Sequence, residues 1–355
     1  MTVRVRPAVV ALPSYVPGKP AAAGLFKLSS NENPYPPLPG VLAAAELACR
    51  QMNRYPDLGN VAVTTAVAAR LGVGEDQLAF ATGSVAVLYH LVQAVCEPGN
   101  EVIFAWRSFE AYPIAVQLTG ARQVRVPLRP GAVHDLGAIR SAVTPATRAI
   151  LLCSPNNPTG PALEHDAVVE LIESVPDHIL ITLDEAYVEF VTDPAAVRGL
   201  ELVRAHPNVA VLRSFSKAYG LAGFRIGYCV ADPALARAVR AAALPFGVSV
   251  AAQAAAVASL AAEEELMTRV AELVKARSEL AQGLVDLGFD VPDAQGNFVW
   301  LPSGARTTEH AAEFAAGGVM VRPFAAGEPG DGIRITVGER EANELVLRIA
   351  ATLLH

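Results

Sequence analysis

The chain has 355 residues, of which 52% are hydrophobic and 18% charged, and its formal net charge is −7. The hydrophobic fraction excludes a disordered chain, and the negative balance without a run of Lys or Arg argues against a nucleic-acid-binding protein. Because single cores usually stop growing at about 250–300 residues, the length predicts two domains.

The N-terminal segment is rich in Pro and ends in PYPPLPG (34–40), which cannot continue a helix or a central strand. We expect residues 1–40 to form an extended arm that packs with the small domain or with a partner subunit. The start, MTVRVRPAVV, lacks a secretory hydrophobic region, and the four cysteines contain no C-x-x-C pair. These features predict a cytoplasmic protein.

From about Val41 to residue 247, helical stretches alternate with short apolar strands, expected at 101–105, 123–128, 149–153, 178–183 and 209–213. Strands separated by helices predict an α/β domain with a mostly parallel, doubly wound sheet. The uncharged stretch Ala241 to Ala262 is long enough to span a membrane. It contains Pro245, Gly247 and Gln253, so we interpret it as a turn leading into a buried helix.

Residues 248–355 have a different pattern, which predicts a smaller α+β domain. A helical run rich in Ala and Glu extends from about Val248 to Leu287, and a final amphipathic helix is expected from Glu339 on. Between them lie four short strand-like segments: FDV, NFVWL, VMVRPF and GIRITVG.

Polar segments follow three successive strands of the predicted large sheet. They are SPNNPTG (154–160), DEAYVEF (184–190) and SFSKAYG (214–220). Ligands of open parallel sheets bind beyond the carboxyl ends of the strands, so these segments predict one crevice with an amide, a carboxylate, a phenol and an amine. A fourth segment, FATGSVAVLYH, turns at Gly83 and opens a helix at Ser84, whose free backbone N–H groups suit a phosphate.

Lys217 is the candidate nucleophile of this crevice. The chain has 28 basic residues, and only Lys19, Lys27, Lys217 and Lys275 are lysines. A lysine amine can lose its proton and attack a carbonyl, whereas a guanidinium cannot.

The motifs SPNNPTG, DEAYVEF, SFSKAYGLAGFRIGY and GIRITVG occur in this order, with LSSNENPYPP near the start and NRYPD at 53–57. This series resembles the fold-type I aminotransferases that use pyridoxal 5′-phosphate, and within them the histidinol-phosphate and aromatic aminotransferase branch. The resemblance covers nearly the whole chain. WRSFEAYP (106–113) is similar to the actinobacterial aromatic amino acid aminotransferases.

The resemblance implies a role for each catalytic residue. Lys217 would form the Schiff base with the cofactor and carry the proton, and Asp184 would keep the pyridine nitrogen protonated. Asn157 and Tyr187 would hydrogen-bond the 3′ oxygen of the cofactor. Phe109 would stack on the pyridine ring, with Tyr112 as the alternative.

The resemblance also implies the residues that bind the phosphate and the substrate. The phosphate would be held by Gly83, Ser84, Val85, Ser214, Ser216 and Arg225, and by Tyr55 of the neighbouring subunit of a homodimer. Arg334, Arg322 and Asn157 would bind the substrate carboxylate, because a carboxylate favours a permanently charged bidentate partner. The seven histidines show no metal-ligand spacing, so no metal is expected.

The expected activity is transfer of an amino group between an aromatic amino acid (Phe, Tyr or Trp) and a 2-oxo acid such as 2-oxoglutarate. The N-terminal arm offers Tyr15, Leu25 and Phe26 as apolar surface for such a side chain, and LPFGVS offers Phe246. Histidinol phosphate is the alternative substrate, since two arginines could hold a phosphate.

Three further classes remain as alternatives. An amino-acid-phosphate decarboxylase would use the same scaffold. A ligand-sensing regulator would need a DNA-binding domain, for which we expect the arm to be too short. A nucleotide-binding oxidoreductase or kinase is disfavoured because neither G-x-x-x-x-G-K-[ST] nor G-x-G-x-x-G occurs at a strand–helix junction.

Overall fold

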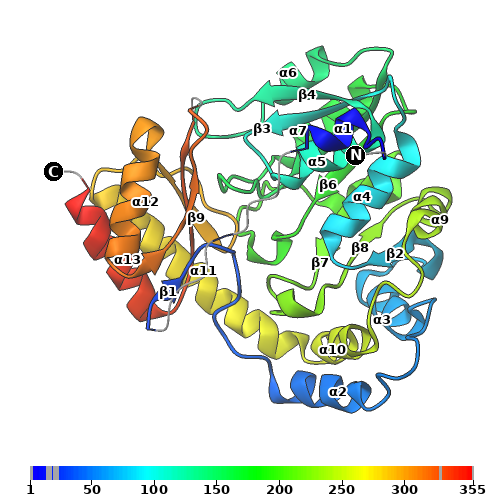
Figure 1. The fold of residues 1–355 in the computed structure, drawn as a ribbon, viewed down its shortest axis with the longest axis horizontal. Helices are drawn as coiled ribbons and strands as arrows, with labels where there is room; N and C mark the ends of the chain where they lie inside the picture. The colour runs from blue at the N-terminus through cyan, green and yellow to red at the C-terminus, as the bar shows by residue number, and fades with distance from the viewer. Residues whose placement is uncertain (1–2, 13–17, 19–23, 328–329, 354–355) are drawn as a thin grey trace.

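A computed structural model of the protein describes residues 3–12, 18, 24–327 and 330–353 (Figure 1). Its largest element is a seven-stranded sheet of order β2-β8-β7-β6-β5-β3-β4. The strands are β2 (Leu78–Ala81), β3 (Glu101–Trp106), β4 (Arg122–Pro127), β5 (Thr147–Cys153), β6 (Leu180–Asp184), β7 (Val209–Ser214) and β8 (Gly227–Val230). The five adjacent strands β7, β6, β5, β3 and β4 are parallel, and β8 is antiparallel to both β7 and β2.

Helices cover both faces of this sheet. They are α2 (Pro39–Cys49), α3 (Val61–Leu71), α4 (Ser84–Val95), α5 (Ala111–Thr119), α6 (Leu136–Ser141), α7 (His165–Ser174), α8 (Gly199–Ala205), α9 (Pro233–Ala242) and α10 (Val250–Ala261). Neighbouring residues of β5 belong to different hydrophobic cores: Ile150 belongs to the core that includes residues of α7 and α8, and Leu151 to the core that includes residues of α4 and α5. The inner strands are apolar on both faces, as expected for a doubly wound sheet, whereas the edge strand β4 is polar and largely exposed.

A second, three-stranded antiparallel sheet has the order β11-β12-β9, with β9 (Phe298–Pro302), β11 (Arg322–Phe324) and β12 (Gly332–Thr336). It packs with α11 (Glu263–Asp286), α12 (Thr307–Ala316) and α13 (Arg340–Thr352), on the left in Figure 1. The N-terminal segment joins this part of the molecule, because β1 (Phe26–Lys27) pairs in parallel with β10 (Val319–Met320).

The predicted strands at 101–105, 123–128, 149–153, 178–183 and 209–213 correspond to β3 to β7. Three local expectations are wrong. The expected extended arm contains a short helix, α1 (Pro7–Val10); the helical run from 248 to 287 is broken at Ala262; and FDV (289–291) forms no strand. None of the helices in the described ranges is long and apolar enough to cross a membrane.

The division of the chain at 247/248 stays a prediction. Helix α10 follows this point but packs on α2 and α3, and its buried residues Ala252, Ala255 and Ala256 belong to the core beside the large sheet. The packing of α10 favours a boundary closer to the break at Ala262.

Candidate active site

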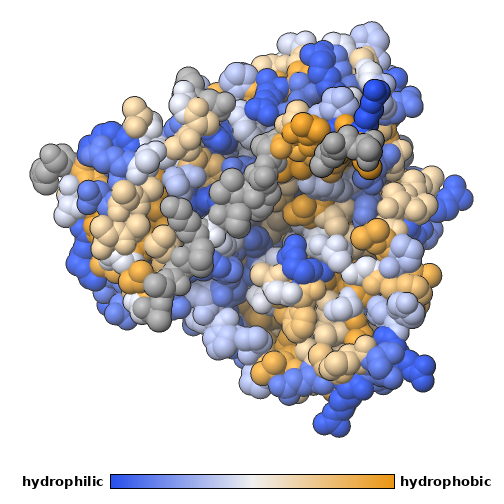
Figure 2. Space-filling view, in the orientation of Figure 1, coloured by the Kyte–Doolittle hydropathy of each residue, from blue (hydrophilic) through white to orange (hydrophobic). Residues whose placement is uncertain are grey.

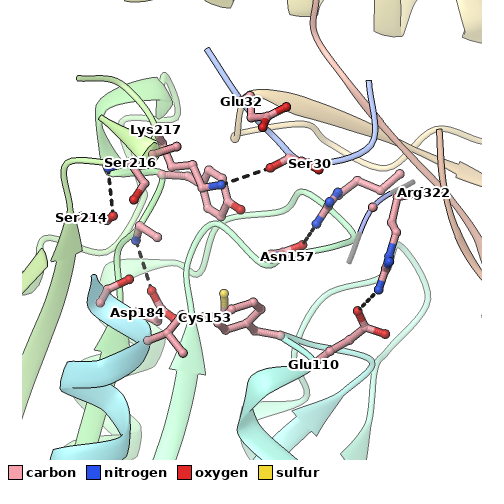
Figure 3. Close-up of a pocket in the computed structure, with 18 of the residues that line it drawn as sticks. Ser30, Glu32, Glu110, Cys153, Asn157, Asp184, Ser214, Ser216, Lys217 and Arg322 are labelled. Carbon is pink, nitrogen blue, oxygen red and sulfur yellow. Dashed lines mark hydrogen bonds and ion pairs between the residues drawn. The ribbon is translucent and has the colours of Figure 1, made fainter. Parts of the chain in front are cut away.

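A cavity of about 270 Å³ lies between the carboxyl ends of the parallel strands and the three-stranded sheet. Figure 3 shows that side chains from both sheets and from the N-terminal segment converge on it. Its lining includes most of the predicted site residues: Ser84, Val85, Phe109, Asn157, Asp184, Tyr187, Ser214, Ser216, Lys217, Arg225, Arg322 and Arg334.

Lys217 follows β7 and extends its amine toward the N-terminal segment. Its Nζ donates to the carbonyl oxygens of Asn31 at 3.2 Å and Ser30 at 3.4 Å. Burial and the positive charge of Arg334 lower the pKa of Lys217 from its ordinary 10.5 to about 7. Since the neutral amine is the nucleophilic form, this environment activates Lys217 near neutral pH.

Asp184 is the last residue of β6 and is buried. Its Oδ2 accepts from the hydroxyl of Tyr112 at 3.1 Å, and its Oδ1 accepts from the N–H of Ala186 at 3.3 Å. Burial raises the pKa of Asp184 to about 6, although both hydrogen bonds lower it. The carboxylate is therefore mostly ionised at neutral pH and can stabilise a cation in the cavity.

The N-terminus of α4 and the segment after β7 form a small polar cradle. Gly83 precedes α4 with a φ of 88°, and a Cβ there would lie 2.6 Å from Nη2 of Arg225. Nη1 of Arg225 donates to the Ser216 hydroxyl at 3.3 Å, and the Ser216 N–H donates to the Ser214 hydroxyl at 3.0 Å. A helix N-terminus with hydroxyls and a guanidinium is suited to an anion.

The segment SPNNPTG places its two asparagines differently. Asn156 holds the turn, accepting from the Ser108 hydroxyl at 2.7 Å and donating to the Arg107 carbonyl and to the Thr159 hydroxyl. Asn157 faces the cavity, and its Oδ1 accepts from Nη1 of Arg334 at 2.6 Å. Asn156 therefore stabilises the turn, and Asn157 is the asparagine of the pair that faces the cavity.

Tyr187 is buried beside Asn157 in the cavity wall. Its hydroxyl oxygen accepts from Nδ2 of Asn31 at 3.0 Å, and the Lys217 amine lies 5.6 Å from its ring centre. Burial raises the pKa of Tyr187, so the hydroxyl keeps its proton at neutral pH and remains a donor.

The two predicted substrate-binding arginines have different partners. Arg334 donates to Asn157 and to the Ser29 carbonyl at 2.8 Å. Arg322 forms a 2.6 Å ion pair with Glu110, at the start of α5. We call Glu110 and Arg322 the mouth pair.

Several predicted residues lie away from the cavity lining. The Tyr55 side chain is 82% exposed and stacks on Phe246, with ring centres 4.7 Å apart. Leu25, Phe26 and Phe246 are not among the cavity-lining residues, and Tyr15 lies outside the described residues. Phe109 lines the cavity, whereas the alternative, Tyr112, is fully buried and contacts Asp184.

Sequence reasoning missed three contacts of this site. They are the Tyr112 hydroxyl on Asp184, the Asn31 amide on Tyr187 and the Glu110 carboxylate on Arg322. Glu110 and Tyr112 both lie in WRSFEAYP, and Asn31 lies in LSSNENPYPP, so both motifs carried a signal without indicating the partner.

Comparison with known proteins defines the class of protein. The family model for class I and II aminotransferases matches residues 23–349, so the chain belongs to this family. Among curated proteins, it is 50% identical over 350 residues to the aromatic amino acid aminotransferase of Streptomyces coelicolor, covering 98% of this chain and 96% of that protein. It is 47% identical over 350 residues to the enzyme of the same name from Thermobifida fusca, with the same coverage.

Solved structures give the same fold. Histidinol-phosphate aminotransferase from Sinorhizobium meliloti, in complex with pyridoxal-5′-phosphate, has a TM-score of 0.90 at 27% identity, covering 99% of each chain. N-succinyldiaminopimelate aminotransferase from Mycobacterium tuberculosis has a TM-score of 0.83 at 27% identity, covering 93% of this chain and 94% of that one. The predicted fold class, an α/β fold-type I aminotransferase, is confirmed.

Proposed function

We propose that this protein is a pyridoxal-phosphate-dependent aminotransferase that transfers the amino group of an aromatic amino acid to a 2-oxo acid. The observation that carries the reaction type is a lysine with a pKa of about 7 in the same cavity as a buried carboxylate. The names of the relatives at 47–50% identity favour an aromatic substrate.

The residues of the cavity fit the cofactor. An aldehyde needs a neutral amine, which Lys217 supplies, and a phosphate needs N–H and hydroxyl donors with a positive charge. The cradle at Gly83 supplies these donors, and its guanidinium lies where a Cβ at residue 83 would enter. The buried carboxylate of Asp184 suits a protonated pyridine nitrogen.

When bound, pyridoxal phosphate supplies an aldehyde for the amine and a ring that withdraws electrons from the substrate α-carbon. Lys217 Nζ would carry the proton between the substrate α-carbon and C4′ of the cofactor in both halves of the reaction. Asp184 would hold the proton of the ring nitrogen. Tyr187 and Asn157 would bind the 3′ oxygen, and Phe109 would stack against the ring.

The remaining residues bind the two charged ends. The N–H groups of Ser84 and Val85 at the start of α4 would bind the phosphate, with the hydroxyls of Ser214 and Ser216 and the guanidinium of Arg225. Arg334 would bind the substrate carboxylate, oriented by its hydrogen bonds to Asn157 and to the Ser29 carbonyl.

We propose a homodimer in which Tyr55 reaches the phosphate site of the second subunit. Phe246, which stacks on Tyr55, is one of several exposed large apolar side chains on α2 and in the chain segments around positions 55 and 246; the others are Leu42, Leu47, Met52, Leu58, Val61 and Leu244. Figure 2 shows apolar side chains on this side of the molecule, near α2 and α10. An apolar surface of this kind marks a protein–protein interface.

Subunit mixing tests the shared site. Inactive Tyr55→Ala and Lys217→Arg proteins, mixed under conditions in which subunits exchange, should regain part of the activity, because one site of each hybrid receives both intact residues. Hybrids that form and stay inactive would contradict a shared site.

We also propose that the protein works in the cytoplasm. The four cysteines are all free, which favours this compartment.

Histidinol phosphate is the second candidate substrate, and the specific observation in its favour is the pair of arginines at the cavity. A steady-state comparison of phenylpyruvate with imidazole acetol phosphate as amino acceptor separates the two. We expect the higher kcat/KM for phenylpyruvate; a tenfold preference for the phosphate would overturn the substrate assignment and leave the reaction type standing.

A further inference from the structure

Two guanidinium groups face the cavity from neighbouring strands. Arg322 in β11 and Arg334 in β12 are directly opposite in antiparallel register, so their side chains leave the same face of the sheet. Their guanidinium carbons lie 5.4 and 5.7 Å from the ring centre of Phe324. The cavity therefore has two positions at which an anionic group could bind.

The mouth pair occupies one of these positions. Nη2 of Arg322 donates to Oε2 of Glu110 at 2.6 Å, and the two side chains are 8% and 32% exposed (Figure 3). A partly buried pair is screened by salt less than a surface pair, so Glu110 offsets the charge of Arg322 inside the cavity. Glu110 and the apolar residue Phe109 both line this cavity.

We propose that Glu110 determines substrate specificity by holding Arg322, so that the site disfavours side chains with a phosphate or a second carboxylate. An anionic side chain must displace the Glu110 carboxylate and then lie near it, whereas an aromatic side chain does neither. A dicarboxylic acceptor still binds by exchanging its distal carboxylate for Glu110, at a cost in affinity. This inference rests on the proposed function, since it places amino acid substrates in this cavity.

Glu110→Gln is the central variant, because it removes the charge and keeps the size of the side chain. In the holoenzyme, we expect the ratio of kcat/KM for histidinol phosphate to kcat/KM for phenylalanine to rise about tenfold or more, as Arg322 becomes available for a charge-assisted hydrogen bond. The corresponding ratio for glutamate over phenylalanine should rise in the same direction.

Two further variants separate the mouth pair from a general effect of charge. Glu32 also lines the cavity but pairs with Lys27 at 2.8 Å, so Glu32→Gln removes an equal charge without releasing Arg322. In Glu32→Gln, the logarithm of the ratio of kcat/KM for histidinol phosphate to kcat/KM for phenylalanine should change by less than half as much as in Glu110→Gln. In an Arg322→Gln background, Glu110→Gln should leave this ratio unchanged, because the arginine that Glu110 holds is no longer present.

A binding measurement provides a readout apart from turnover. Calorimetry of the holoenzyme with glutarate and with 3-phenylpropionate compares a dicarboxylate with an aromatic monocarboxylate, and Glu110→Gln should strengthen glutarate binding relative to 3-phenylpropionate by about tenfold. An unchanged ratio in both assays, an equal rise in Glu32→Gln, or a rise that persists without Arg322 would each overturn the inference. These comparisons hold whichever substrate the wild-type enzyme prefers, so they fail independently of the proposed aromatic preference.

Discussion

The inner part of the cavity, formed by Asp184, Tyr187 and Lys217, comes from the ends of two neighbouring parallel strands, β6 and β7. The mouth pair instead joins the start of α5 to the three-stranded sheet. The described hydrogen bonds of the inner residues are to neutral groups, whereas the mouth is held by opposite charges. Under the proposed function, the inner part would carry out the reaction and the mouth would select the substrate.

The largest expected effect is in the inner part. Lys217→Arg keeps a positive charge but removes the amine, so kcat should fall by about 10⁴-fold or more. Lys275→Arg is the matched control, because Lys275 is an exposed residue of α11 with a side chain that is 80% exposed. Borohydride reduction and peptide mapping should place the pyridoxyl group on Lys217, and labelling of Lys27 or Lys275 would contradict the assignment.

Asp184→Asn should lower the rate of α-proton abstraction by about 10²–10³-fold, because a preorganised charge beside the reacting group is lost. Cofactor affinity should change little, since the phosphate contacts remain. Single-turnover spectroscopy with α-deuterated phenylalanine measures the chemical step. A near-normal step would mean that the charge of Asp184 does not contribute to the chemical step, and the distinction between the inner part and the mouth would fail.

Near the mouth pair, we expect loss of the ion pair between Arg107 and Asp331 to lower the stability of the protein. Arg107 donates to Oδ1 of Asp331 at 2.9 Å, and the side chains are 9% and 5% exposed. Oδ2 of Asp331 accepts from the N–H groups of Ala326 and Gly327. Asp331→Ala should lower the free energy of unfolding by about 3–5 kcal/mol, because it leaves a buried charge without this partner.

Urea unfolding of the holoenzyme measures this loss. The control is Glu279→Ala, which removes an exposed pair with Lys275 on α11 and should leave the free energy of unfolding nearly unchanged. Equal stability of the two variants would show that the segment after β11 does not depend on Asp331.

The pH dependence of cofactor uptake tests the environment of Lys217. Its pKa is lowered from 10.5 to about 7, so the reactive neutral amine dominates above pH 7 and decreases below it. The rate of cofactor uptake by the apoenzyme should be half-maximal near pH 7 and should fall about tenfold per pH unit below that value. Nα-acetyl-lysine, measured in parallel, corrects for ionisation of the cofactor itself, and a midpoint above about pH 9 would contradict the lowered pKa.

The smallest expected effect is that of Tyr112→Phe. The Tyr112 hydroxyl donates to Asp184 and lowers the pKa of the carboxyl, so its loss should raise that pKa further. At pH 7 kcat should fall about fivefold, corresponding to about 1 kcal/mol for one hydrogen bond, and the acid limb of the kcat profile should move to higher pH. A fall in kcat without this movement would assign Tyr112 a packing role alone.

Much of the fold could be predicted because parallel strands have a strong local pattern. Apolar runs such as AILLC and VAVLR are buried on both faces, and each lies within a strand of the large sheet. The residues after these strands could be predicted to meet, since the carboxyl ends of parallel strands lie at one edge of the sheet. The antiparallel strand β8 was missed, because its first two residues, Gly227 and Tyr228, end the motif SFSKAYGLAGFRIGY and were interpreted with it.

The partners of the site residues could not be predicted. Tyr112 and Asp184 are 72 positions apart, and Glu110 and Arg322 are 212 apart. Periodicity reports which face of an element is buried but not which residue of another element it contacts. The packing of α10 could not be predicted for the same reason, since its alanine-rich sequence indicates a buried helix but not which helices it packs against.

The sequence by itself determined the class of sheet, the order of the strand-end motifs and the choice of Lys217 and Asp184, because these depend on local burial and on the chemistry of single side chains. Only the tertiary structure decided that Tyr112 holds Asp184, that Asn31 contacts Tyr187 and that Glu110 holds Arg322. Those contacts depend on how separate elements dock, and docking is set by packing over the whole core rather than by any one segment.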